Sequence, residues 1–266
     1  MIFNTVSIAG TDPSGGAGMQ ADLKTFSALG SYGMSIVTAV VAQNTQGVAE
    51  IHQLPGVFVT RQMEVLFDDV HVDAVKIGML GNAEVIQAVA SALKKYRLRH
   101  IVLDPVMVAT SGDPLLSNNA AHTMRDELLP LVDLVTPNLA EAAQLLGERE
   151  ARNEEEMLDQ LDRLEQFCPG ILIKGGHLDG SYSVDFLRVN GTTTRLEAPR
   201  VPTQNTHGTG CTLSAAIAAL RPQRPDWMSA VSDSKDYLTK ALKKSHALHV
   251  GHGHGPVHHF HGSWPE

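Results

Sequence analysis

The chain has 266 residues, a formal net charge of −8 and 43% hydrophobic residues. This composition is typical of a globular protein with a large core and excludes a disordered chain. The acidic balance, without any basic stripe, argues against nucleic acid as a partner.

Other features concern the compartment and the number of domains. The first residues, MIFNTVSIAG, lack the basic and cleavable apolar segments of a secretory signal. The most apolar stretch, 35–42, is too short to span a bilayer. Cys168 and Cys211 are the only two cysteines, a count typical of a reducing compartment. No linker or repeat divides the sequence. We therefore expect a cytoplasmic protein with one domain, residues 1–266, and no membrane partner.

Short apolar runs alternate with helical patterns along the chain. The runs that predict strands are residues 5–9, 35–42, 74–77, 100–103, 134–136 and 171–173. The patterns that predict helices are residues 20–29, 61–70, 83–95, 119–128, 139–146, 154–167, a segment starting near 211, and 228–249. Residues 183–189 and 192–197 flank Asn190-Gly191, a strong hairpin signal. The pattern predicts an α/β fold: a mostly parallel central sheet, helices on both faces, and a short antiparallel hairpin at one edge.

Polar and glycine residues follow most of the predicted strands. They are Gly10-Thr11-Asp12, Gln43-Asn44, Gly78-Met79, Asp104, Asn138 and Lys174-Gly175. In an open parallel sheet, ligands bind beyond the carboxyl ends of the strands. We therefore expect these residues, with the loop before Cys211, to meet at one edge of the sheet.

The segment 205–216, NTHGTGCTLSAA, is the most informative stretch. Its glycines lead into an apolar helical segment, so the N–H groups of Gly208, Thr209 and Gly210 would converge at a helix N-terminus. Such a site suits an anion, above all a phosphate. Cys211 would lie in the same field, which favours thiolate over thiol and lowers the pKa of a cysteine. The alternative interpretation is an ordinary helix cap followed by a small buried cysteine, which would have the same sequence pattern.

Three further features, one of them a pair of residues, have two interpretations each. Asn138 and Glu141 lie three apart at a helix start, which suits either a hydrated Mg²⁺ or a capping box. Asp104 ends a strand before a proline, where it could either form the turn or serve as a second acidic group near the metal. Lys174 ends a buried strand, where its charge needs a partner such as phosphate unless it reaches the rim.

Two other patterns are weaker. The loop 10–18, GTDPSGGAG, contains the short G-x-G-x-x-A form of a dinucleotide loop, but no acidic residue ends a second strand about twenty residues on. No Walker A motif occurs, so a phosphate-transferring chain would use a different loop. The C-terminal histidines suggest a metal site, although no spacing fixes four ligands. They are His252, His254, His258, His259 and His261.

Together these segments resemble the bacterial hydroxymethylpyrimidine/phosphomethylpyrimidine kinases of the ribokinase superfamily. The resemblance covers nearly the whole chain. It rests on AGTDPSGGAGMQADLKTFSALG (9–30), TAVVAQNTQGV (38–48), KIGML (76–80), LDPVM (103–107), SGDPLL (111–116), TPNLAEA (136–142), IKGGHL (173–178), NTHGTGCTLSAA and GPVHHF (255–260).

The resemblance implies that ATP phosphorylates 4-amino-5-hydroxymethyl-2-methylpyrimidine and then its monophosphate, in thiamine biosynthesis, with Mg²⁺ and in a homodimer. It implies that Gln43 binds the pyrimidine, and an amide does match an aminopyrimidine edge. The other residues that it implies for this pocket are Gly10, Asp22, Met79 and Val106. It assigns the phosphates and ATP to Lys174, Asn138 and Thr209, the metal to Glu141 and Asp104, and catalysis to Cys211, Lys174, Gly208 and Gly210.

Two alternatives stay open. A pyridoxal or pyridoxine kinase would bind phosphate at a similar site, the glycine-containing helix start at 208–211, which we call the phosphoryl cradle. Its acceptor would be a similar flat heteroaromatic alcohol. A non-catalytic pyrimidine sensor would need no phosphoryl cradle, so the presence of Lys174, Glu141 and Cys211 together argues against it. Most of the superfamily carries aspartate where Cys211 stands, and this leaves its role as a base in question.

Overall fold

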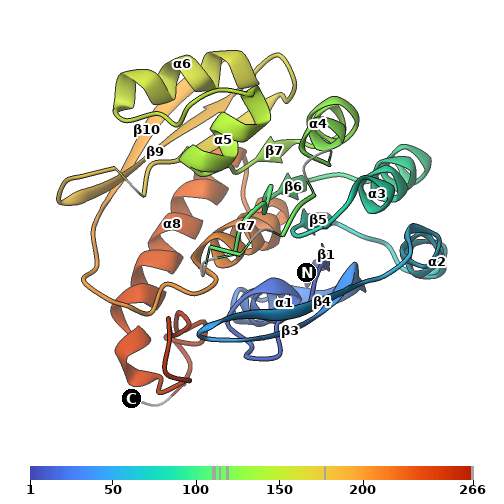
Figure 1. Ribbon diagram of the computed structural model, residues 1–266, viewed down its shortest axis with the longest axis horizontal. Coiled ribbons are helices and arrows are strands. Elements are labelled where there is room, and N and C mark those ends of the chain that lie inside the picture. Colours follow the sequence, from blue (N-terminus) through green and yellow to red (C-terminus); the bar gives the residue numbers. More distant parts are fainter. Residues whose placement is uncertain (110–111, 114, 118–119, 177, 265–266) are drawn as a thin grey trace.

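A computed structural model describes residues 1–266 except 110–111, 114, 118–119, 177 and 265–266. At its centre is an eight-stranded sheet in the order β10-β9-β8-β7-β6-β5-β1-β2 (Figure 1). The strands are β1 (Asn4–Ala9), β2 (Tyr32–Val37), β5 (Ala74–Ile77), β6 (Ile101–Leu103), β7 (Leu134–Val135), β8 (Gly170–Lys174), β9 (Tyr182–Val189) and β10 (Thr192–Pro199).

The sheet confirms the predicted mixture of strand directions. In this sheet β2, β1, β5, β6, β7 and β8 run parallel, whereas β9 and β10 are antiparallel to their neighbours. Asn190 and Gly191 connect β9 to β10 with φ values of 51° and 72°, the left-handed conformation that a two-residue hairpin turn requires. Because the parallel strands share one direction, their carboxyl ends form a single edge.

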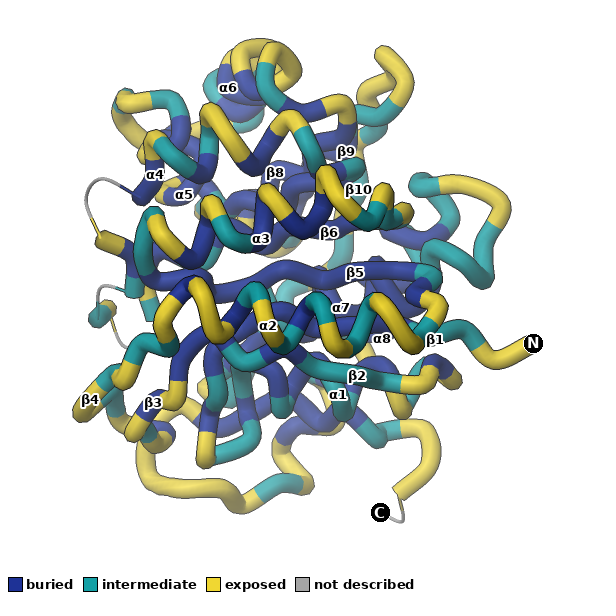
Figure 2. Tube along the Cα trace, turned by 90° about the vertical axis from the view of Figure 1, so that its right-hand side faces the viewer, coloured by how far each residue is buried: buried dark blue, intermediate teal, exposed yellow. Residues whose placement is uncertain are grey.

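Helices cover both faces of the sheet (Figures 1 and 2). One face carries α1 (Gly18–Ala28), α7 (Thr209–Leu220) and α8 (Trp227–Lys243). The other carries α2 (Gly56–Phe67), α3 (Ala83–Tyr96), α4 (Ala120–Thr123), α5 (Leu139–Leu146) and α6 (Glu154–Leu164). Two separate apolar clusters fill the space between sheet and helices. Within the described residues, no helix is long and apolar enough to cross a membrane.

The prediction of one buried strand over residues 35–42 was wrong. The chain leaves the central sheet at the end of β2 and enters a separate two-stranded sheet, β3 (Ala39–Asn44) with β4 (Gly47–Gln53). Thr38 lies between them and donates its hydroxyl to the Met79 carbonyl at 2.7 Å. Because the run 35–42 is largely apolar and contains no Gly or Pro, its sequence gives no local sign that the chain passes from one sheet to another. Strand β4 was not predicted from the sequence.

Several predicted helices differ in extent. The segment predicted at 61–70 is α2, which begins at Gly56 and ends at Phe67, and the one predicted at 154–167 is α6, which ends at Leu164. The segment 119–128 begins as α4 and continues as a π-helical turn, Met124–Leu128, whereas Asn119 lies outside the described residues. The segment 228–249 forms α8 only as far as Lys243, and a 3₁₀ turn, Ser245–Ala247, follows. The Ser245 hydroxyl donates to the Leu242 carbonyl at 2.7 Å and helps to end the helix.

A buried ion pair joins α1 to the central sheet. Lys76 in β5 and Asp22 in α1 have no exposed side-chain surface, and their Nζ and Oδ2 atoms lie 2.8 Å apart. Ser7 donates its hydroxyl to the same Oδ2 at 2.6 Å. Burial alone would lower the pKa of Lys76. The negative charge of Asp22, with a smaller contribution from Asp104, outweighs burial and raises the pKa above the ordinary lysine value.

The Asp22→Asn variant should therefore be strongly destabilised, because it leaves the Lys76 ammonium buried without its counter-ion. Loss of one partner of a buried pair costs about 3–5 kcal/mol of unfolding free energy. Urea denaturation at neutral pH measures this loss. The double variant Asp22→Asn/Lys76→Met, which removes both charges, should recover much of it.

The Glu64→Gln variant serves as a matched control for charge removal at an exposed pair. Glu64 accepts from Lys95 at 3.1 Å on the surface between α2 and α3, where such pairs contribute about 0–1 kcal/mol. Equal losses for Asp22→Asn and Glu64→Gln would show that the buried pair does not stabilise the fold.

Candidate active site

One large cavity lies at the carboxyl edge of the parallel strands, with a volume of about 950 Å³. Nearly all of the residues selected from the sequence border it. They are Gly10, Gln43, Met79, Asp104, Val106, Asn138, Glu141, Lys174, Gly208, Thr209, Gly210 and Cys211. A cavity of this size can hold two small molecules side by side. The structure thus gathers residues from across the chain into one site.

Helix α7 begins in this cavity. The N–H group of Thr209, expected to be free, donates to the Thr206 carbonyl at 3.3 Å. Gly208 has a φ of 75° and makes no side-chain cap bond. In the described residues, no acceptor is found for the N–H groups of Gly210 and Cys211. Helix formation leaves such groups without a partner inside the helix, and here they face open space. The arrangement fits an anion site rather than a helix start closed by a side-chain cap.

Lys174 lies at the end of β8, and its side chain is only 14% exposed, so it does not reach the rim. Its Nζ atom lies 3.0 Å from Oδ1 of Asp104 and 3.8 Å from Oε2 of Glu141. A Cβ on Gly210 would lie 3.4 Å from the same Nζ. The lysine charge therefore lies beside the α7 start, where the free N–H groups are.

Asn138 and Glu141 form the complete capping box of α5. The Asn138 side chain accepts from the Glu141 N–H at 2.9 Å, and the Glu141 carboxylate accepts from the Asn138 N–H at 2.7 Å. Both residues also border the cavity. Burial, with the nearby Asp104 charge, outweighs Lys174 and raises the pKa of Glu141 to about 7. The capping and the site interpretations are thus compatible.

The carboxylates fit a divalent cation only in a limited way. Among the described residues, no group of three or more His, Cys, Asp or Glu side chains could hold a metal ion. Asp104 and Glu141 both face Lys174, which already compensates their charge. Mg²⁺ keeps several waters and binds through one or two carboxylates together with substrate phosphates. The residues therefore fit a cation that arrives with a nucleotide.

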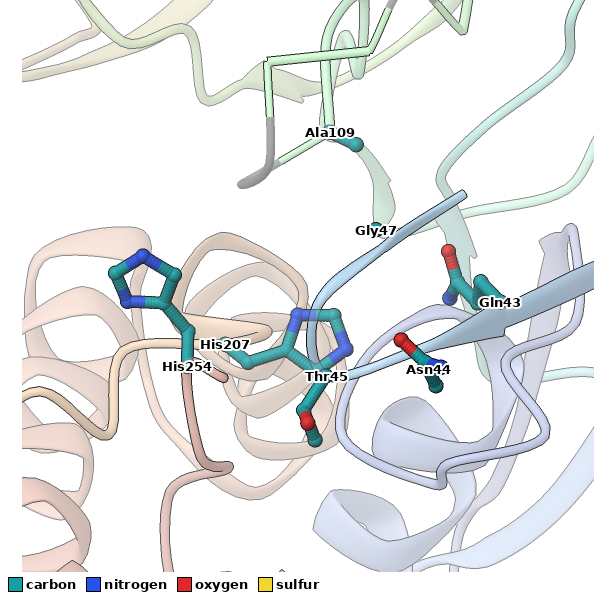
Figure 3. A pocket seen from close by; sticks show the side chains of 7 residues that line it. All are labelled: Gln43, Asn44, Thr45, Gly47, Ala109, His207 and His254. Carbon is teal, nitrogen blue, oxygen red and sulfur yellow. The ribbon is translucent and has the colours of Figure 1, made fainter. Parts of the chain in front are cut away.

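Gln43 borders an apolar part of the cavity. A β-bulge between Ala42 and Gln43 changes the register of β3, and bulges commonly redirect a side chain. Met79 and Val106 belong to the small apolar cluster beside it. Gly10 leaves room for this cluster, because a Cβ there would lie 3.1 Å from the Met79 sulfur. In Figure 3 the Gln43 amide points away from its strand, and Gln43 lines the pocket shown there.

Asp22 does not border the cavity, which corrects the expectation that it lines the pyrimidine pocket. Its side chain is fully buried against Lys76 and Ser7. Lys76 borders the cavity instead. Sequence reasoning missed Lys76, although a lysine inside the otherwise apolar run AVKI was a visible signal.

Cys211 also departs from its expectation. A helix N-terminus by itself lowers the pKa of a thiol. Burial, together with the charges of Asp22 and Asp104, instead outweighs the opposing charge of Lys76 and raises the pKa of Cys211 to about 11. The thiol therefore stays protonated at neutral pH in the ligand-free site. The predicted lowering of the pKa was wrong, because burial, the largest cause, and the surrounding charges both come from segments that are distant in sequence.

The C-terminal histidines lie beside the site in different environments. His258 and His259 are buried, whereas His252 and His254 are exposed. His259 pairs through Nε2 with the hydroxyl of Thr212, in the first turn of α7, at 3.1 Å. This contact ties the C-terminal segment to the α7 start.

Comparisons with known proteins agree with this geometry. Residues 12–258 match the model of the family described as phosphomethylpyrimidine kinase. A hydroxymethylpyrimidine/phosphomethylpyrimidine kinase of Escherichia coli (strain K12) is 54% identical over 263 residues, which cover 98% of this chain and 99% of that protein. The enzyme of the same name from Rhizobium meliloti (strain 1021) is 49% identical, with 98% of each chain covered.

Solved structures give the same result. A phosphomethylpyrimidine kinase of Clostridium difficile has a TM-score of 0.80 at 40% identity, over 91% of this chain and 100% of that one. A Bacillus subtilis pyridoxal kinase in complex with ADP has a TM-score of 0.90 at 34% identity, over 97% and 98%. On the family match and the high identities, the chain belongs to the phosphomethylpyrimidine kinase family.

Proposed function

We propose that this enzyme transfers the γ-phosphoryl group of ATP to the hydroxymethyl group of 4-amino-5-hydroxymethyl-2-methylpyrimidine, and then to the resulting monophosphate. One observation carries the proposal. A single cavity joins the Gln43 amide, beside an apolar wall, to Lys174 and to the N–H groups of Gly210 and Cys211, for which the described residues offer no acceptor. The first part suits a flat aminopyrimidine and the second suits a phosphoryl group.

In this proposal, some groups of the site bind the transferring phosphoryl group and others stabilise its negative charge. The N–H groups of Gly210 and Cys211 bind the oxygens of the transferring γ-phosphoryl group, and Lys174 adds positive charge. Removal of one preorganised donor typically costs about 3 kcal/mol of transition-state stabilisation. Because phosphoryl transfer passes through a loose transition state, positioning and charge stabilisation matter more than early removal of the hydroxyl proton.

Mg²⁺ belongs to this proposal as the partner of ATP. Glu141 would hold it together with the phosphate oxygens, while Asp104 keeps Lys174 in place. When bound, the cation would neutralise charge on the phosphates. Asn138 and Thr209, which also border the cavity, would contact the nucleotide. The location in the cytoplasm and the homodimer stay predictions.

The substrate preference tests the function. The structural likeness to pyridoxal kinases makes pyridoxal the alternative acceptor. With ATP and Mg²⁺, kcat/KM should be higher for the pyrimidine alcohol than for pyridoxal, and the monophosphate should be converted to the diphosphate. A coupled ADP-release assay with each acceptor measures this. A clear preference for pyridoxal would overturn the proposal.

The Gln43→Ala variant should weaken pyrimidine binding selectively. Two lost hydrogen bonds of about 1 kcal/mol each predict a KM for the pyrimidine alcohol that rises roughly 10-fold to 50-fold, with a much smaller change for ATP. Asn44→Ala is a matched control at the same strand end, because Asn44 is exposed and its side chain accepts from the Gln46 N–H. Similar effects of both variants would contradict the role of Gln43.

The Cys211→Ser variant tests whether the thiol acts as a base. Because its raised pKa keeps the thiol protonated well above neutral pH, we expect kcat to fall less than tenfold and the pH–rate profile between pH 6 and 9 to keep its shape. General-base catalysis would contribute roughly 10²–10⁴-fold. A loss of that size, with the basic limb of the profile altered, would identify Cys211 as the base.

A further inference from the structure

The second transfer sets a charge problem that the first does not have. A phosphate oxygen of the monophosphate forms the new bond to the γ-phosphorus, the bond from phosphorus to the β,γ-bridging oxygen breaks, and ADP leaves with that electron pair. The attacking oxygen is already anionic, so no proton is removed. Two highly charged phosphate groups must, however, approach each other. A cationic group near the pyrimidine site would offset this repulsion.

Among the described residues, the lysines that border the cavity already have carboxylate partners, and the Arg200 guanidinium donates to backbone carbonyls such as that of Gly180. Lys76 pairs with Asp22, and Lys174 pairs with Asp104. Lys235, in α8, pairs with Asp185, and its Nζ atom lies 2.5 Å from Oδ2. Another titratable side chain, His207, borders the cavity next to the α7 start. A histidine differs from these lysines because its ring has two nitrogens, and one can bind a ligand while the other holds a partner.

His207 is held by one of its nitrogens. Its Nε2 lies 2.9 Å from Oδ2 of Asp12, which is fully buried. Burial alone would raise the pKa of Asp12, but hydrogen bonds from His207, Ser14 and the Ala17 N–H outweigh it and hold the pKa well below its usual range. Since the carboxylate is ionised and can only accept, Nε2 carries the proton. Across the described residues, no hydrogen bond to Nδ1 is found.

His207 also lies between the two parts of the site. It directly precedes Gly208, so it borders the phosphoryl cradle. It borders both the large cavity and a smaller pocket, and Gln43 borders the same two spaces. Figure 3 shows the His207 ring between His254 on one side and Gln43 with Asn44 on the other. The phosphate of a monophosphate bound at Gln43 would have to lie between Gln43 and the cradle.

We propose that His207, oriented by Asp12, binds the phosphate of the acceptor monophosphate in the second transfer by donating from an Nδ1–H group. In this state both ring nitrogens carry a proton, so that Nε2 donates to Asp12 while Nδ1 donates to the phosphate. This inference rests on the proposed function. It assigns His207 as a specificity-determining residue for the phosphorylated acceptor. The alcohol has no phosphate to contact it. The residue therefore affects one of the two reactions far more than the other.

The His207→Gln variant separates this role from a structural one. Glutamine places its amide nitrogen where Nε2 lies, so it can still donate to Asp12, but it has no nitrogen at the Nδ1 position. Calorimetry gives Kd values for the monophosphate and for the alcohol. A hydrogen bond to a charged group predicts that the ratio of these Kd values rises roughly 10-fold to 100-fold. His254→Ala, on the other side of the small pocket, should change the ratio less than twofold.

His207→Asn provides the reverse test, because its amide nitrogen replaces Nδ1 and cannot reach Asp12. It should have a lower Tm than the glutamine variant but a smaller Kd ratio. A ratio that His207→Gln leaves at the wild-type value would refute the inference, as would equal ratios for the two variants. Wild-type enzyme that phosphorylates neither acceptor would refute the proposed function instead, so the two failures are distinguishable.

Discussion

The contact between two glycine-containing loops determines the geometry of the site. A Cβ on Gly208 would lie 1.9 Å from the Gly16 carbonyl oxygen, and a Cβ on Gly16 would lie 2.4 Å from the His207 ring. Only glycine permits this approach, and the φ of 75° at Gly208 favours glycine for a second reason. The loop after β1 therefore supports the start of α7 directly. Without this contact, the N–H groups of α7 would have no fixed position relative to the pyrimidine pocket.

Asp12 and the C-terminal segment hold this contact from two sides. Asp12 accepts from Ser14, Gly16 and Ala17 of its own loop as well as from His207. On the other side, the His207 N–H donates to the Gly255 carbonyl at 3.0 Å. The C-terminal histidine-rich segment, which suggested a metal site by composition, thus contributes to the position of the cradle through its backbone.

The sequence predicted those features that depend on local chemistry. Asn190-Gly191 forms the hairpin, Asn138 and Glu141 form a capping box, and the glycines before Cys211 open a helix start, because each pattern acts within a few residues. The features it failed to predict depend on distant partners. The His207–Asp12 contact spans 195 residues, and the charges around Cys211 come from α1, β5 and the end of β6. Similarly, Asp22, which the family resemblance assigned to the pocket, is buried against Lys76, a partner 54 residues away in the sequence.

The charges of the site explain why a neutral thiol suits position 211. Two ammonium groups, Lys76 and Lys174, already face three carboxylates, those of Asp22, Asp104 and Glu141. An aspartate at position 211 would add a fourth carboxylate where the acceptor must bind. That charge would assist removal of a proton from an alcohol, but it would repel a monophosphate, whose attacking oxygen needs no base. A protonated cysteine keeps the backbone N–H and avoids the repulsion. An enzyme that phosphorylates both acceptors in one cavity therefore gains more from neutrality at this position than from a strong base.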